Sequence, residues 1–66
     1  MKLVLNGQAY EAEGPLSVQD LLRRIGREGT PCAVEVNQTL VPHRERAARD
    51  LADGDRVEVV TLVGGG

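Results

Sequence analysis

Aromatic residues are almost absent from this sequence, since Tyr10 is the only one among 66 residues. The hydrophobic core must therefore be aliphatic, built from leucine, valine, isoleucine and alanine. A single cysteine, Cys32, excludes an internal disulfide, which commonly stabilises small secreted domains. No apolar run approaches the roughly 20 residues of a membrane span, and Met1 and Lys2 lead into a strand pattern, not a signal peptide. We therefore expect a cytoplasmic protein with no membrane partner.

Charge of one sign is not concentrated anywhere along the chain. Eight basic residues are scattered among ten acidic ones, and the net charge is −2. A nucleic-acid-binding surface needs a basic stripe that neutralises phosphates, and the sequence has none. We therefore expect no nucleic-acid partner.

Residues that could support catalysis are also scarce. Cys32 opens an apolar stretch, where a lone cysteine is typical of a small core residue. His43, the only histidine, lies in a charged segment with no metal-ligand spacing around it, so we expect it to be solvated. The carboxylates form no acid/base pair, and no glycine-rich loop leads from a strand into a helix. We expect no catalytic residues, no metal site and no enzymatic activity of the chain by itself.

Local signals predict one helix within a series of short strands. Asn6 and Gly7 favour a type I′ turn between strands over 2–6 and 8–13. Ser17 is a good N-cap, and Asp20 stands where a capping-box acid belongs. An apolar stripe with helical spacing follows Ser17, formed by Val18, Leu21, Leu22 and Ile25. Further strands are predicted over 32–36, 40–41 and 56–63.

Between these strands, residues 43–50 are polar and indicate a surface turn of helix or 3₁₀-helix. One helix covering one face of a sheet gives an α+β domain in two layers. Among two-layer α+β folds, the element order favours a β-grasp (ubiquitin-like) roll, with a mixed four- to five-stranded sheet packed on the helix. We expect residues 1–63 to form this domain and residues 64–66 to form a flexible tail.

The last three residues, Gly64, Gly65 and Gly66, suit one particular task. Glycine has no Cβ, so a glycine run can lie in a narrow channel and carry a terminal carboxylate into a buried active site. Fixing such a tail costs about 1–2 kcal/mol per residue, so a folded body must dock first and supply binding energy. The alternative is a frayed end or a cloning scar.

The last predicted strand offers a docking surface. Alternation places Val57, Val59 and Thr61 on one face, and Glu58, Val60 and Leu62 on the other. If Glu58 faces water, then Val60 and Leu62 form an exposed apolar patch beside the tail. Alternatively, neighbouring strands or the tail itself cover both residues.

Several short segments, spread over the whole chain, form a family pattern. They are Asn6, Ser17-Val18-x-Asp20-Leu21-Leu22, Ala33-Val34-Glu35-Val36-Asn37, Val41-Pro42, Gly54-Asp55-Arg56-Val57-Glu58 and Val63-Gly64-Gly65-Gly66. In these segments the sequence resembles the ThiS family of sulfur-carrier proteins. One departure follows Pro42, where His43 and Arg46 replace the arginine and the large aromatic residue that are usual in the family.

The resemblance implies a mechanism centred on the Gly66 carboxylate. An E1-like adenylyltransferase of the ThiF type would use ATP and Mg²⁺ to form an acyl-adenylate on it. A sulfur donor linked to a cysteine desulfurase would then displace AMP and leave a thiocarboxylate. The carrier would dock on a ThiG-type thiazole synthase and deliver sulfur for the thiazole of thiamine. Gly64 and Gly65 would form the flexible tail that carries Gly66. Val60 and Leu62 would be the residues that dock on the partner, and the chain itself would bind no cofactor.

Three other interpretations stay open. A molybdopterin-type sulfur carrier would keep the chemistry and change the pathway. A ubiquitin-like modifier would join its terminus to lysines of target proteins. A non-covalent β-grasp interaction module would have an inert tail, so removing Gly65 and Gly66 would leave its function unchanged.

Overall fold

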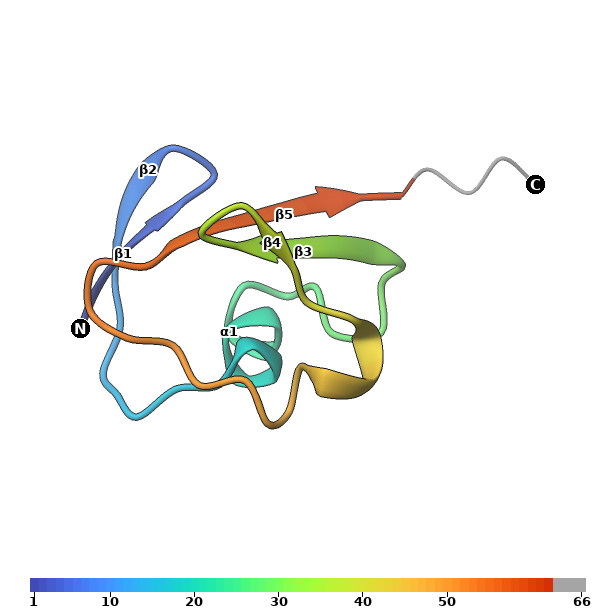
Figure 1. Ribbon diagram of the computed structural model, residues 1–66, viewed down its shortest axis with the longest axis horizontal. Helices are drawn as coiled ribbons and strands as arrows, with labels where there is room; N and C mark the ends of the chain where they lie inside the picture. The colour runs from blue at the N-terminus through green and yellow to red at the C-terminus, as the bar shows by residue number, and fades with distance from the viewer. Residues whose placement is uncertain (63–66) are drawn as a thin grey trace.

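The structure is a computed structural model, and it describes residues 1–62. Within these residues, five strands form one mixed sheet that packs against one α-helix (Figure 1). The elements are β1 Lys2–Leu5, β2 Gln8–Glu11, α1 Val18–Arg24, β3 Cys32–Val36, β4 Thr39–Leu40, the 3₁₀-helix η1 His43–Glu45 and β5 Arg56–Thr61. This order is the one that the sequence predicts.

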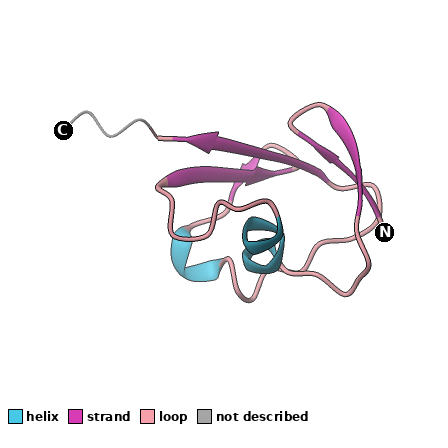
Figure 2. Ribbon diagram, turned by 180° about the vertical axis from the view of Figure 1, so that it is seen from behind, coloured by secondary structure: helices cyan, strands magenta, loops and turns pink. Residues whose placement is uncertain are grey.

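The strand order across the sheet is β2-β1-β5-β3-β4, so the last strand lies at the centre. β5 runs parallel to β1 and antiparallel to β3, while the pairs β1–β2 and β3–β4 are antiparallel. Seen from behind, the helix covers one face of the sheet and leaves the other without a helical layer (Figure 2). This is the predicted two-layer β-grasp arrangement.

Positive backbone φ angles occur where the sequence predicts tight turns. Asn6 and Gly7 have φ angles of 49° and 80°, as a type I′ turn requires. Asn37 and Gln38, at 52° and 69°, make the corresponding turn between β3 and β4. Some boundaries differ from the prediction: β2 ends at Glu11, β4 begins and ends one residue earlier, and Val63 lies outside the described residues.

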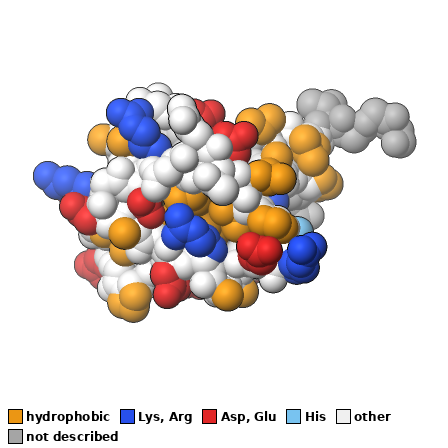
Figure 3. Space-filling model, viewed as in Figure 1, with side chains coloured by type: hydrophobic (Ala, Val, Ile, Leu, Met, Phe, Trp, Pro, Cys, Tyr) orange, Lys and Arg blue, Asp and Glu red, His pale blue; other side chains and the backbone are white. Residues whose placement is uncertain are grey.

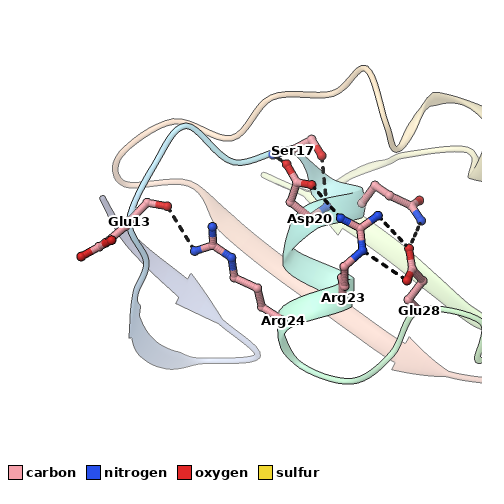
Figure 4. A network of polar contacts seen from close by, with 7 residues as sticks. Glu13, Ser17, Asp20, Arg23, Arg24 and Glu28 are labelled. Carbon is pink, nitrogen blue, oxygen red and sulfur yellow. Dashed lines mark hydrogen bonds and ion pairs between the residues drawn. The ribbon is translucent and has the colours of Figure 1, made fainter.

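The helix begins with the predicted capping box. The Ser17 hydroxyl accepts a hydrogen bond from the Asp20 backbone N–H at 3.0 Å, and the Asp20 carboxylate accepts one from the Ser17 N–H at 3.0 Å (Figure 4). The hydrogen bond from the Ser17 backbone N–H lowers the pKa of Asp20, because it stabilises the charged carboxylate. Arg23 pairs with Glu28 at 3.1 Å and lowers the pKa of that carboxylate in the same way. The first turn and the C-terminal side of α1 are thus fixed by local polar contacts.

The core between the sheet and the helix is aliphatic, as the scarcity of aromatic residues predicts. The helix contributes Val18, Leu21 and Leu22, all at most 2% exposed. The other buried apolar residues are Leu3, Leu16, Cys32, Val34, Val36, Val41, Leu51, Val57 and Val59. Full burial of one such aliphatic side chain contributes about 1.5–3 kcal/mol, so this cluster is the main source of stability.

The segment after Pro42 departs from the prediction at one residue. His43 is exposed, as expected, and Leu51 is buried beneath the segment. Arg46, however, is only 7% exposed, although the pattern places the whole of 43–50 at the surface. The 3₁₀ turn directs its side chain toward β3, where the guanidinium Nη2 donates to the Cys32 carbonyl oxygen at 2.6 Å. The surface assignment is therefore wrong for Arg46.

Candidate functional site

The end of β5 exposes two apolar side chains, as the alternation of the strand predicts. Val57 and Val59 are buried against the helix, whereas Val60 is 56% exposed. Leu62, one residue past the strand, is 51% exposed, and its backbone N–H donates to the Pro31 carbonyl oxygen at 2.9 Å. This bond keeps Leu62 beside the start of β3. The predicted exposure of Val60 and Leu62 is confirmed.

Two asparagine side chains fix β5 along its length. The Asn6 side chain donates to the Val59 carbonyl oxygen at 3.2 Å and accepts from the Val59 N–H at 2.8 Å. The Asn6 side-chain amide thereby extends the hydrogen bonding between β1 and β5, as one more pair of backbone N–H and C=O groups would. At the start of the strand, the Asn37 side chain accepts from the Arg56 N–H at 2.9 Å. The sequence indicates both asparagines as turn residues but gives no sign of these cross-strand bonds.

The exposed face of the sheet combines apolar and acidic side chains. Val60 lies opposite Ala33 on β3, Glu58 lies opposite Glu35, and Glu35 lies opposite Leu40 on β4. Directly opposed residues share a face, and Leu40 is 60% exposed. Figure 3 shows hydrophobic and acidic side chains gathered over this part of the sheet. We call this surface the open face and define it as Ala33, Glu35, Leu40, Glu58 and Val60.

A pocket of about 340 Å³ lies beside Leu62. Its lining includes the exposed His43, the buried Cys32 and Arg46, whose Nη1 lies 3.8 Å from the Cys32 sulfur. Cys32 is thus a core residue, as predicted, with an arginine contact that the sequence does not reveal. A larger hollow of about 710 Å³ lies at the other end of the molecule, beside Met1 and Asp53. That hollow touches neither Val60 nor Leu62.

Exposed apolar side chains are the main surface feature that the described residues show near the end of β5. Within residues 1–62, no group of three or more histidine, cysteine or acidic residues is placed to hold a metal ion. None of the helices in this part of the chain is long and apolar enough to cross a membrane. The predicted carrier residue Gly66 and its lead, Gly64 and Gly65, lie outside the described residues.

Comparison with known proteins gives consistent matches over the whole chain. A family model described as "ThiS family" matches residues 3–66. "Sulfur carrier protein ThiS" of Escherichia coli is 27% identical over 66 residues, which are 100% of both proteins. "Uncharacterized protein ycf40" of Porphyra purpurea is 36% identical over 66 residues, 100% of this chain and 93% of that protein. "Thiazole synthase" of Paramagnetospirillum magneticum is 38% identical over 66 residues, but the chain spans only 20% of that protein.

Solved structures agree with these matches. The crystal structure of a thiamine biosynthesis protein (ThiS) from Geobacter metallireducens superimposes with a TM-score of 0.85 at 30% identity, covering 100% of both chains. The NMR solution structure of a thiamine biosynthesis protein from the same organism gives a TM-score of 0.81, covering 100% of this chain and 88% of the other. The β-grasp fold predicted from the element order is confirmed.

Proposed function

Because the chain belongs to the ThiS family, we propose that it is the sulfur carrier of thiamine (thiazole) biosynthesis, with the Gly66 carboxylate as its working group. One observation carries this proposal: the family match extends from residue 3 to residue 66 and so includes the three glycines. The chain would act as a co-substrate of partner enzymes rather than as a catalyst. Residues 1–63 would form the docking body, and residues 64–66 the tail that enters the partner.

The proposed chemistry proceeds in two displacements on the partner. A Gly66 carboxylate oxygen attacks the α-phosphorus of ATP and expels pyrophosphate, which gives an acyl-adenylate. A sulfur nucleophile at the oxidation level of sulfide then attacks the acyl carbon and expels AMP, which gives the thiocarboxylate. The first step needs ATP and Mg²⁺, which would belong to an E1-like adenylyltransferase of the ThiF type. A cysteine-desulfurase-linked donor would supply the sulfur as a persulfide, and a thiol reductant would bring it to the sulfide level.

The structure supports a docking role for Val60 and Leu62 in this scheme. Ordering three glycines costs about 1–2 kcal/mol each, which the tail cannot recover from its own contacts. Val60 and Leu62 are half-exposed apolar residues at the end of the central strand, immediately before residues 63–66. Burying such side chains on a partner would supply the missing free energy.

The comparisons also support a ThiG-type thiazole synthase as the acceptor of the sulfur. The chain matches a segment that makes up a fifth of proteins named thiazole synthase in Paramagnetospirillum magneticum and Magnetococcus marinus. Joining two domains in one polypeptide raises their effective concentration for each other, which favours partners that must meet repeatedly. We expect the chain to meet its thiazole synthase in the cytoplasm.

Mass spectrometry of the C-terminal peptide tests this function directly. The protein is purified from its own cells, and the peptide is examined for one sulfur in place of one oxygen on Gly66. The peptide is needed because oxidation of Met1 or Cys32 adds almost the same mass to the intact chain. Sulfur on Gly66 is the expected result. An unmodified carboxylate that persists after incubation with the adenylating partner, ATP and a sulfur source would refute the carrier role and favour an interaction module with an inert tail.

A further inference from the structure

Arg46 carries a buried positive charge that no acid of residues 1–62 neutralises. Only 7% of the residue is exposed, and the ion pairs of this part of the chain join other residues. Its guanidinium donates to the Cys32 carbonyl oxygen at 2.6 Å and lies 3.8 Å from the Cys32 sulfur, which is a weak acceptor. Its Nε has no hydrogen-bond partner among the described residues. A neutral carbonyl and a thiol do not offset the cost of burying a cation, so this guanidinium lacks an anion within residues 1–62.

The same arginine lines the pocket of about 340 Å³ that lies beside Leu62. Arg27 and Glu28 are the other arginine and the acid of this lining. Glu28 pairs with Arg23 at 3.1 Å and forms no ion pair with Arg46 (Figure 4). With the histidine of the lining uncharged, two arginines and one glutamate give the pocket one net positive charge. This charge suits a monoanion better than a dianion.

Apolar side chains also contribute to the walls of this pocket, namely Leu22, Pro31 and Leu62. They favour a ligand that has a short hydrocarbon body beside its charged group. The volume of about 340 Å³ lies at the low end of the range for small-molecule pockets. A small aliphatic carboxylate therefore fits the charge, the apolar walls and the size.

We propose that this pocket binds a small aliphatic carboxylate whose oxygens pair with the Arg46 guanidinium. A planar carboxylate matches the fork of N–H donors and can accept from the Nε–H, which has no other partner in the described residues. A water molecule could accept from the same group, but it brings no negative charge and leaves the buried cation uncompensated. The site is separate from the proposed carrier function, because this binding needs neither the glycines nor a partner enzyme.

Titration of the full-length protein with sodium butyrate at constant ionic strength, followed by NMR, tests the proposal. We expect saturable shifts of the Arg46 side-chain N–H signals and the Leu62 amide signal, with a dissociation constant of about 1 mM. Butyramide has the same shape without the charge, so its dissociation constant should be at least about tenfold higher. Equal affinity for the two compounds would overturn the proposal. So would a dissociation constant for butyrate above roughly 50 mM, which would make it an adventitious additive only.

Two arginine variants locate the binding site. Arg46→Lys keeps the positive charge but loses the Nε–H and the planar fork, so it should weaken butyrate binding at least about tenfold. Arg44→Lys is the matched control, because Arg44 is exposed and lies outside the pocket lining, and it should change the affinity by less than about twofold. Equal affinity of the two variants would contradict the proposal. The comparison of butyrate with butyramide needs only the wild type, so it decides even if Arg46→Lys does not fold.

The terminal carboxylate of Gly66 offers the same chemistry from within the chain, and a synthetic protein separates the two sources. In this protein the Gly66 carboxylate is replaced by a carboxamide. Butyrate should bind it with the wild-type affinity, within about twofold. Butyrate binding that appears only in the carboxamide protein would show that the chain's own terminus occupies the pocket, and it would overturn the assignment to a small molecule.

Discussion

The guanidinium of Arg46 ties the segment after Pro42 to the first residue of β3. Its Nη2 donates to the Cys32 carbonyl oxygen at 2.6 Å, and its Nη1 lies 3.8 Å from the Cys32 sulfur. The Arg46 carbonyl oxygen also accepts a hydrogen bond from the Gln19 N–H in the first turn of α1, at 3.1 Å. One residue thus connects η1, β3 and α1. Its aliphatic stem adds packing to these polar contacts, since only 7% of the residue is exposed.

Replacing Arg46 should destabilise the fold much more than replacing its exposed neighbour. Arg46→Ala leaves the Cys32 carbonyl oxygen without its charged donor and opens a gap beside it. We expect a loss of about 2–4 kcal/mol in the free energy of unfolding, measured by urea denaturation. Arg44→Ala is the control, because the Arg44 side chain is 84% exposed, and it should change stability by less than about 0.5 kcal/mol. Equal stability of the two variants would contradict the bridging role of Arg46.

At the scale of elements, Asn6 serves both the hairpin turn and the central strand. Its φ angle of 49° suits asparagine or glycine, and its side chain makes the two hydrogen bonds to Val59. Asn6→Gly keeps the turn geometry and removes the side-chain bonds, which should cost about 1–2 kcal/mol of unfolding free energy. Asn6→Ala should cost roughly 1 kcal/mol more, because alanine is strained at positive φ. A glycine variant as stable as the wild type would show that the bonds to Val59 contribute nothing.

The capping box gives α1 a dependence on pH with a definite sign. The pKa of Asp20 is lowered, chiefly by its hydrogen bond from the Ser17 backbone N–H. Because the pKa of Asp20 is lower in the folded state, its charge stabilises the fold above the pKa of the unfolded state, near 3.9. This stabilisation is lost as the pH falls through the pKa of the folded state. The melting temperature of Asp20→Asn should therefore lie below that of the wild type at neutral pH, and the two should converge below about pH 4.

Thermal unfolding of the wild type and Asp20→Asn, measured in steps from neutral to acid pH, tests this dependence. A gap between wild type and Asp20→Asn that stays constant down to pH 2 would mean that the Asp20 charge does not stabilise the cap.

These elements also show which features the sequence could predict. The Asn6-Gly7 turn, the Ser17 cap and the alternation along β5 depend on neighbours in the chain, so local chemistry was enough to predict them. The burial of Arg46 and the opposition of Glu35 to Glu58 depend on strands and turns that are distant in sequence. Strand alternation assigns a side chain to a face, but the register between two strands decides which residue it meets. The carrier role of Gly66 came from the family resemblance and stays a proposal.

For the whole molecule, the sheet order gives β5 both a buried face and an exposed end. β5 lies between β1 and β3, so its inner residues Val57 and Val59 belong to the core while Val60 and Leu62 stay exposed. The central strand of the sheet is also the strand that precedes the glycines in the sequence. In the proposed function, a partner that binds the open face would also receive the end of β5 and the Gly66 carboxylate that follows it in the sequence.

Two variants should separate docking from chemistry in an assay of thiocarboxylate formation. Val60→Ser combined with Leu62→Ser should raise the half-saturating carrier concentration roughly 10- to 100-fold, because each residue loses apolar contact with the partner. Both residues are about half-exposed, so the unfolding free energy should change by less than about 1 kcal/mol. Deleting Gly65 and Gly66 should instead abolish the product at every carrier concentration and leave the melting temperature within about 2 °C of the wild type. A deletion variant that still forms product would remove Gly66 from the mechanism, whereas unchanged half-saturation of the serine variant would move the docking surface away from the end of β5.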